Sequence, residues 1–506
     1  MMTPNDSMRP LPPRHRAARR LRKRSAMHKR TIGWFFLGCM LFASMFILLA
    51  CVVDPLQLYH KPWFYKPVYT TEERYQNAGL AKNYEYETII IGSSMTENFF
   101  PSKVEEAIGG KTMKLSFRGS YVDEQYMAAK LALGTGQVKT VLWGLDYFAL
   151  KTNINEGQNA FPYYLYDRNF LNDYKYWFNY THYERLIRGL VRQYRTGHVQ
   201  GLEGLYNWNF SVKFGEDVTI RHYRKALTEE AIAAKVNEED PLEVVQGNFN
   251  KYVLSLIEAH PDVKFLIYYP PYSILRHVVW RETNPERYEY QLFMKEWMYE
   301  QFSRFPNVEV YDFQTEADWS FHLDYYKDMS HHHQDINTWI AQAIGRRDPK
   351  YLVTADNVRD FVEELDRQVD EATVSDDDRL FRVRVFLDDG GGLTPISLGT
   401  LMIGNGGNLR VPAKGLAELL GAELEWERET KHLRLTAGDR TFELTVGETT
   451  ALADGETIEL TDPAQLIGGT TFVPLAETAA AFGWEASRTD LGDREFEVLL
   501  KAPGQR

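Results

Sequence analysis

Cysteine is nearly absent from this chain of 506 residues. Its two cysteines, Cys39 and Cys51, both lie in one apolar stretch near the N-terminus, so the rest of the chain can form no disulfide and has no thiol for catalysis. A large domain without disulfides depends on its hydrophobic core for stability. The apolar content of 44% is enough for two or more domains, and nothing in the composition indicates global disorder.

Acidic residues are scarce at the N-terminus, and charges of either sign are missing directly after it. Residues 1–30 hold ten Lys or Arg and one acid, Asp6, a net charge of +9 that leaves −21 for the rest of a chain with a total of −12. Residues 31–53 carry no charge, and as a helix with a rise of ~1.5 Å per residue they can cross a hydrocarbon core of ~30 Å. Because Lys and Arg stay on the cytoplasmic side, we expect a cytoplasmic tail (1–30), a single-pass anchor in the cell membrane (31–53) and an extracytoplasmic C-terminal bulk.

Two alternatives to an uncleaved anchor remain open. One is a cleaved signal peptide, and the other is a lipoprotein signal, because residues 48–51 loosely imitate a lipobox that ends at Cys51. The apolar stretch is longer than the roughly 7–15 residues of a signal-peptide core, and Leu49 is unusual in a lipobox. Both observations favour the anchor.

Short apolar runs alternate with amphipathic stretches between residues 54 and 349. Helix-like segments at 102–108 and 123–133 end at glycines, and the apolar runs between such segments predict buried strands at 86–91, 112–116, 140–145, 264–269 and 308–312. Strands separated by helices indicate an α/β fold with a parallel sheet, right-handed crossovers and helices on both faces.

Two motifs supply the parts of a serine acyl-transfer site. Gly-Ser-Ser at 92–94 directly follows the first predicted strand, where a serine exposes its hydroxyl at the carboxyl edge of a parallel sheet. Asp-Met-Ser-His at 328–331 precedes a helix predicted at 333–344. We therefore expect Ser94 to be the nucleophile, His331 its general base and Asp328 the carboxylate that orients the imidazole.

The order Ser, Asp, His, with the last two three residues apart, resembles the SGNH (GDSL-like) hydrolase superfamily. That resemblance implies a flavodoxin-like sheet, esterase or O-acyltransferase chemistry, and an oxyanion hole built from the backbone N–H groups of Ser94 and Gly119. Asp146 stands where the family has an asparagine donor, and an ionised carboxylate offers only acceptors. Ser93 replaces the aspartate of the family, a variant that resembles envelope-polymer-modifying members such as alginate O-acetyltransferases and the D-alanyl transfer protein of teichoic acids.

Histidines at 331–333, with His322 nearby, raise the alternative of a metal site. Three adjacent histidines on a strand or loop point in divergent directions and rarely chelate one ion together. Solvated loop histidines are the simpler interpretation, so we expect no metal, and the proposed chemistry requires no cofactor.

Aromatic residues crowd an insertion at 147–260 that interrupts the predicted sheet. They can form a platform for sugar rings, or they can pack a helical cap onto the sheet, and the sequence leaves both roles open. The better-placed candidates for lining the cleft, and our predicted substrate-binding residues, are Tyr269 and Tyr272 at the end of the fourth strand. The aromatics of the insertion include Tyr163, Tyr164, Tyr166, Tyr174, Tyr176, Trp177, Tyr180, Tyr183, Tyr206 and Trp208.

Residues 350–380 predict one more helix followed by an acidic linker at 375–378, which lacks the glycine and distal glutamate of a calcium loop. The remainder, 381–501, contains a repeat offset by 62 residues, in which a Val-Pro pair starts a short helix that ends at glycine, at 409–422 and again at 471–484. This repeat resembles the copper amine oxidase N-terminal-like stalk domain of many secreted proteins of Gram-positive bacteria. Its single histidine, His432, leaves a copper centre without ligands, so adhesion or spacing in the wall is the expected role.

These features predict a membrane-anchored, extracytoplasmic O-acyltransferase or esterase that acts on a cell-wall or exported polysaccharide. An outward domain has no access to cytoplasmic acyl-CoA, so a transferase would need a membrane-bound O-acyltransferase partner to supply acyl groups. An esterase of the same fold is one alternative, and a non-catalytic wall-binding or scaffold protein is another. We expect no nucleic-acid partner.

Overall fold

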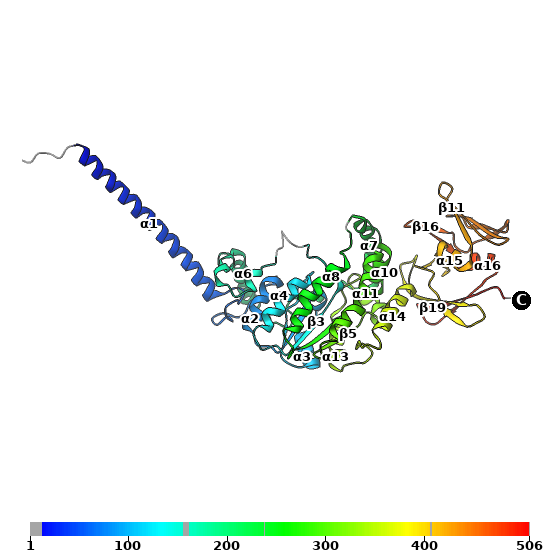
Figure 1. Cartoon of the computed structure of the whole chain (residues 1–506), viewed down its shortest axis with the longest axis horizontal. Helices are drawn as coiled ribbons and strands as arrows, with labels where there is room; N and C mark the ends of the chain where they lie inside the picture. The colour runs from blue at the N-terminus through cyan, green and yellow to red at the C-terminus, as the bar shows by residue number, and fades with distance from the viewer. Residues whose placement is uncertain (1–12, 155–160, 237, 405–406, 505–506) are drawn as a thin grey trace, which may run out of the picture. The chain divides into compact units, whose positions relative to one another are not determined.

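The computed structural model describes residues 13–154, 161–236, 238–404 and 407–504 (Figure 1). The chain forms two compact units. The first combines Met1–Tyr84 with Pro162–Gln200, and the second combines Glu85–Phe161 with Gly201–Arg506. Part of the aromatic insertion therefore folds with the N-terminal segment.

The second unit contains a five-stranded sheet in which all neighbouring strands are parallel. The strand order is β2-β1-β3-β4-β5, which is the order of flavodoxin-like sheets. The predicted α/β class and parallel sheet are thus confirmed, and each strand coincides with a predicted apolar run to within two residues. The strands are β1 (Thr88–Gly92), β2 (Thr112–Lys114), β3 (Thr140–Gly144), β4 (Lys264–Tyr269) and β5 (Val308–Asp312).

Helices cover both faces of this sheet because its side chains are apolar on both sides. On one face Ile90 and Leu142 pack in a core cluster with Ile340 of α13. On the other, the Trp143 indole N–H donates to Gln125 of α4 at 2.8 Å. Crossover helices include α3 (Pro101–Ile108), α4 (Val122–Leu133) and α11 (Pro285–Phe302), and α13 (Gln334–Gly345) follows the last strand.

The described part of the insertion between β3 and β4 consists of helices and the loops that connect them. One of its helices, α7, packs against α10, which also packs against α14, and Ile220, Val278 and Leu365 of these three helices are buried members of one apolar cluster. Besides the short 3₁₀ helices η2 (Tyr147–Leu150) and η5 (Asn209–Ser211), the described helices of the insertion in the second unit are α7 (Glu216–Val236), α8 (Leu242–Asn248), the π-helix η6 (Phe249–Leu254) and α9 (Ser255–Glu258). Their neighbours are α10 (Ile274–Thr283) and α14 (Val358–Glu371).

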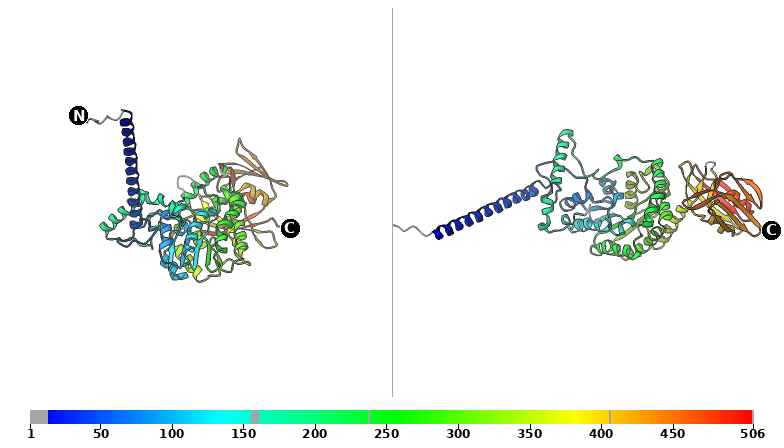
Figure 2. Two further views of the ribbon diagram at one scale, coloured as in Figure 1. Left: turned by 60° about the vertical axis from the view of Figure 1, so that its left-hand side comes forward. Right: turned by 90° about the horizontal axis from the view of Figure 1, so that it is seen from above.

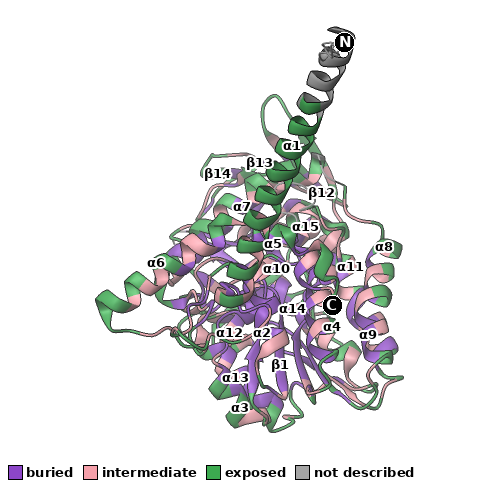
Figure 3. Cartoon of the chain, turned by 90° about the vertical axis from the view of Figure 1, so that its left-hand side faces the viewer, coloured by how far each residue is buried: buried purple, intermediate pink, exposed green. Residues whose placement is uncertain are grey.

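The first unit is built around the end of one long helix, α1 (Pro13–Val53). Its segment Ala26–Val53 is long and apolar enough to span a membrane, and its side chains are almost entirely exposed (Figure 3). Directly after α1 the buried Asp54 carboxylate accepts hydrogen bonds from three backbone N–H groups and from the Tyr176 hydroxyl, which ties the insertion to the base of the helix. The other helices here are α2 (Glu73–Asn83), α5 (Tyr174–Trp177) and α6 (Tyr180–Thr196).

The C-terminal part is rich in β-structure (Figure 2). One nine-stranded sheet has the order β16-β17-β10-β9-β6-β7-β19-β18 with β8 on β7, and a five-stranded meander runs β11-β12-β13-β14-β15. The strands are β6 (Ala372–Ser375), β7 (Leu380–Asp388), β8 (Leu393–Pro395), β9 (Met402–Ile403), β10 (Leu409–Pro412), β11 (Glu423–Glu427), β12 (His432–Ala437), β13 (Arg440–Thr445), β14 (Thr450–Ala453), β15 (Glu456–Glu459), β16 (Gln465–Ile467), β17 (Thr470–Pro474), β18 (Glu485–Asp490) and β19 (Glu495–Lys501).

The predicted repeat is visible as two strand–helix units, β10 with α15 (Ala413–Leu420) and β17 with α16 (Leu475–Ala481). The two repeat strands pair antiparallel, with Val411 opposite Val473. The predicted acidic linker differs from the structure. Residues 372–375 form the buried strand β6, and only the aspartates at 376–378 lie in a turn, because β6 pairs with both β7 and β9.

Candidate active site

Ser94 stands at the carboxyl end of β1, where the strand turns into the short 3₁₀ helix η1 (Ser94–Thr96). The turn is tight because Gly92 has φ +151°, and a Cβ atom there would lie 2.8 Å from the Gly144 carbonyl oxygen of β3 and 2.6 Å from the Thr96 methyl group. Asn337 of α13 holds η1 from the other side by donating to the Met95 carbonyl. The Ser94 side chain is thus held at the sheet edge while remaining partly exposed.

His331 meets Ser94 from a loop 237 residues later in the chain. The Ser94 Oγ and His331 Nε2 atoms are 2.7 Å apart. The other ring nitrogen, Nδ1, lies 2.8 Å from Asp328 Oδ2 and 3.1 Å from Oδ1. The structure therefore brings the three predicted residues into one hydrogen-bonded line, serine hydroxyl to imidazole to carboxylate.

The loop fixes Asp328 before any substrate arrives. Its Oδ1 accepts the backbone N–H groups of Ser330 and His331, each at 2.8 Å, and the Met329 carbonyl accepts both the N–H and the hydroxyl of Ser273. Burial alone would raise the pKa of Asp328, but the hydrogen bonds and charge of His331 outweigh burial and lower it well below its usual range. The carboxylate is therefore ionised at neutral pH and stabilises a positive imidazole.

A tryptophan from the insertion completes the surroundings of this line. Trp208 donates its indole N–H to the Ser94 carbonyl at 3.3 Å and meets the His331 ring edge-on, with the ring centroids 5.5 Å apart. The Lys327 ammonium lies 4.2 Å above the same indole. Trp208 is one of the insertion aromatics named from the sequence, whereas Lys327 is an addition from the structure, and its position next to Asp328 is the one sequence signal for it.

The expected oxyanion donors have different surroundings. Gly119 lies in an exposed turn with φ +56°, a left-handed conformation that favours glycine. Within the described part of the chain, neither its backbone N–H nor that of Ser94 donates to a protein acceptor. Both groups are therefore available to a developing negative charge.

Asp146 has a different arrangement from an oxyanion donor. It is buried, and its carboxylate accepts the Ser93 hydroxyl at 2.5 Å and the Tyr272 hydroxyl in a short hydrogen bond. Burial raises the pKa of Asp146, and the two hydroxyl donors partly offset that shift. Both oxygens serve as acceptors for protein groups, so Asp146 supports the serine loop through Ser93, the residue before Ser94.

Tyr269 and Tyr272 are both buried. The Tyr272 hydroxyl is occupied by Asp146, and Lys295 lies over the Tyr269 ring at 5.7 Å. Neither ring therefore presents the exposed face that a role in lining the cleft would require.

The neighbouring histidines bind different groups. His332 is buried with Nδ1 3.2 Å from the His333 carbonyl, His333 Nε2 accepts from Asn209, and His322 Nδ1 lies 2.9 Å from the Asp318 carbonyl. Among the described ranges 13–154, 161–236, 238–404 and 407–504, no group of three or more His, Cys, Asp or Glu side chains is arranged to hold a metal ion.

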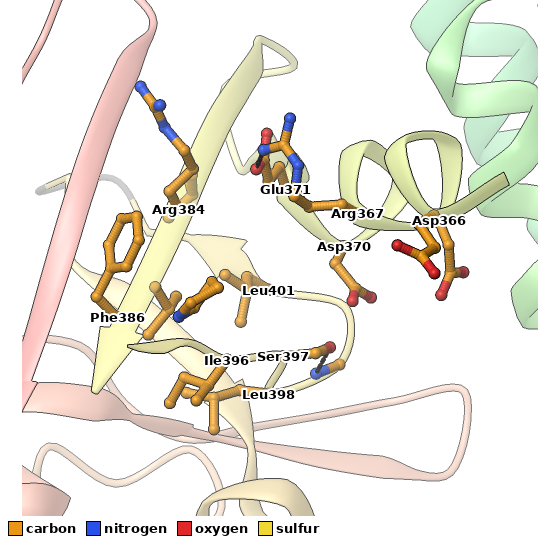
Figure 4. A pocket seen from close by; sticks show the side chains of 15 residues that line it. Asp366, Arg367, Asp370, Glu371, Arg384, Phe386, Ile396, Ser397, Leu398 and Leu401 are labelled. Atoms are coloured by element: carbon orange, nitrogen blue, oxygen red, sulfur yellow. Dashed lines mark hydrogen bonds and ion pairs between the residues drawn. The ribbon is translucent and has the colours of Figure 1, made fainter. Parts of the chain in front are cut away.

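The described part of the second unit contains several hollows, two of which bear on the search for the site. One, of about 250 Å³, adjoins His331 and Asp328 and is bordered by α7 residues such as His222 and Lys225. Another, of about 440 Å³, lies between α14 and β7, where Arg367 turns toward Glu371 and the floor is apolar (Figure 4). The lining of the second hollow contains no histidine, whereas the first hollow adjoins His331.

Comparison with known proteins identifies one domain. The family described as copper amine oxidase N-terminal domain matches residues 399–490. Residues 399–490 form a copper amine oxidase N-terminal-like domain. The copper amine oxidase N-terminal-like domain has one histidine and no cysteine, and His432 Nε2 lies 3.5 Å from Glu443, so its residues do not fit a copper centre.

For the rest of the chain the comparisons are weaker. No curated protein matches the chain. A solved structure described as "a putative platelet activating factor from Streptococcus pneumonia" aligns over 61% of this chain and 98% of its own, with 13% identity and a TM-score of 0.28. That level of likeness supports no statement about activity, which must come from the site itself.

Proposed function

We propose that the chain is a membrane-anchored, SGNH-like enzyme that removes or transfers an O-acyl group of a cell-envelope polysaccharide, with Ser94 as nucleophile. The observation that carries this proposal is the hydrogen-bonded line Ser94 Oγ to His331 Nε2 at 2.7 Å and His331 Nδ1 to Asp328 at 2.8 Å. A serine is a weak nucleophile unless a base takes its proton, and this geometry provides that base.

In the proposed reaction, Ser94 Oγ attacks the ester carbonyl carbon while His331 Nε2 takes the hydroxyl proton. Asp328 stabilises the resulting imidazolium, and the backbone N–H groups of Ser94 and Gly119 stabilise the oxyanion. The C–O bond to the leaving alcohol then breaks, and His331 returns the proton to that alcohol. The acyl-serine is released when water or a polymer hydroxyl attacks it, with His331 again as base.

The molecule that accepts the acyl group from Ser94 distinguishes an esterase, which uses water, from a transferase. Trp208 lies beside Ser94, but Lys327 lies over its ring and Phe214 stacks near it, so the indole does not by itself select a sugar as the acceptor. A transferase outside the cytoplasm requires a donor, so we propose a membrane-bound O-acyltransferase partner, anchoring through residues 31–53, and contact with the wall through the C-terminal domain.

Turnover of a model acyl ester, such as a nitrophenyl acetate, tests the proposal. Ser94→Ala should lower kcat to the background rate because it removes the nucleophile. Ser102→Ala is the matched control, since Ser102 is a serine of α3 whose hydroxyl donates to Glu203 instead of a histidine. Equal turnover in wild type and Ser94→Ala would contradict the proposal.

The rival function is a non-catalytic scaffold that binds wall polymer. The presence of a copper amine oxidase N-terminal-like domain is the observation in its favour. Wild-type protein that binds polysaccharide but turns over no ester or acylated polymer, even with a candidate acyltransferase, would establish the scaffold.

A further inference from the structure

Helix α6 carries an apolar stripe that no described residue of the first unit covers. Its inner side is buried through His182 and Leu186, and Gly189 lets the helix approach Val68 closely. A second apolar row, with side chains on one helical face, remains exposed to solvent. The members of this exposed row are Tyr180, Ile187, Val191 and Tyr194, the last 92% exposed.

Arginines lie beside this row on the same helix. Arg185, Arg188 and Arg192 line a groove of about 510 Å³ between α6 and residues 68–72. Arg185 pairs with Glu72 and Arg188 with Glu184, but Arg192 has no acidic partner among the described residues. The groove therefore carries excess positive charge next to an apolar surface, which is the pattern of helices that lie in a membrane interface.

The helix begins close to the end of the apolar span. Phe178, two residues before α6, contacts Phe46 of α1 with ring centroids 5.9 Å apart. Phe46 lies seven residues before Val53, about 10 Å along a helix at 1.5 Å per residue. With Val53 taken as the end of the apolar span, this distance is comparable to the roughly 5–10 Å to which an interfacial helix buries its apolar face.

The direction of α6 also suits such a position. In Figures 2 and 3, α6 runs across the direction of α1 instead of continuing it. Exposed aromatic side chains continue the apolar surface around the base of α1, and Trp and Tyr are enriched at such depths. They are Trp63, Phe64, Phe170, Tyr174 and Phe178.

We propose that α6 lies in the headgroup region of an anionic bilayer leaflet, with its apolar row facing the acyl chains and the arginine groove binding lipid phosphates. The inference goes beyond the acyl-transfer proposal and depends on it only for the anchoring role of α1. A lipid surface is favoured over a protein partner because one short helix combines the apolar row, the arginines and a depth set by α1.

The test uses the full chain in nanodiscs, with Cys39 and Cys51 replaced by alanine. Nitroxide labels are attached at Ile187→Cys and Tyr194→Cys, and at Ile232→Cys of α7 as the matched control, because Ile187 and Ile232 are both 60% exposed. In discs that contain phosphatidylglycerol, we expect oxygen to reach both α6 labels better than a water-soluble nickel complex, and the reverse at residue 232. Arg188→Gln/Arg192→Gln should remove the difference between anionic and neutral discs.

Each outcome decides the question. Water-exposed α6 labels in both kinds of disc would overturn the inference while leaving ester turnover and anchoring untouched. Shielding that needs a co-reconstituted membrane protein would also overturn it and identify α6 as a protein-docking helix. Release of the chain by alkaline carbonate would instead refute anchoring through α1, and with it the position of α6.

Discussion

Around Ser94, single residues act through hydrogen bonds that connect distant parts of the chain. Asp146 holds Ser93, 53 residues earlier, and Tyr272, 126 residues later. When a buried carboxylate accepts two hydroxyl groups, the loss of one acceptor oxygen lowers the stability of the folded protein. The hydroxyl that has lost its acceptor is then buried without a partner. Asp146 therefore supports the shape of the serine loop rather than taking part in the reaction.

Asp146→Asn tests this role. An asparagine presents one carbonyl oxygen and one NH₂ group, so one of the two hydroxyls loses its acceptor, and we expect the free energy of unfolding to fall by about 1–3 kcal/mol with no gain in ester turnover. Urea denaturation and ester kinetics measure the two effects. A rise in kcat would show that position 146 contributes to the oxyanion hole instead.

Among the secondary-structure elements, the junction of β1 with η1 sets the nucleophile against β3. Gly92 pairs with Gly144 in the parallel register, and both glycines leave room for the Thr96 side chain. Two small residues at the carboxyl ends of adjacent strands bring the backbone of the serine loop close to the sheet. Any side chain at position 92 would push η1 outward and move the Ser94 hydroxyl away from the His331 ring.

Gly92→Ala should therefore lower both stability and activity. The φ of +151° is nearly restricted to glycine, and the Cβ atom would meet the Gly144 carbonyl, so we expect a loss of about 2–4 kcal/mol and a strong fall in kcat. Thermal denaturation and ester turnover provide the measurements. Gly247→Ala in α8, where no atom lies within 4 Å of the added Cβ, is the control and should keep wild-type behaviour.

Elements that depend on local pattern were predictable from the sequence, and those that depend on distant partners were not. The apolar runs at 264–269 and 308–312 became β4 and β5 with the predicted bounds. The contact between Asp328 and His331 was also predictable from the sequence, because side chains three residues apart in one turn can lie close together. The partners of Asp146, the burial of Tyr269 and the pairing of β6 with β9 arise from tertiary contacts, which no local period encodes.

Across the whole molecule, the charge asymmetry of the chain and its apolar helix predict one orientation. The ten basic residues before position 31 should stay inside the cell, and everything after Asp54 should lie outside. Protease added to intact wall-free cells should digest the chain after Asp54 and spare an N-terminal tag. Protection of the C-terminal domain under these conditions would contradict the orientation and the envelope function together.

The central claim is that Ser94 is activated by His331, and covalent labelling tests it most directly. A fluorophosphonate applied to the full chain should add one phosphonyl group, which peptide mass spectrometry should locate at Ser94, and His331→Ala should suppress the reaction because the base is removed. Ser102→Ala should label as the wild type does. Absence of labelling, or a label on another hydroxyl with Ser94 unmodified, would contradict the account.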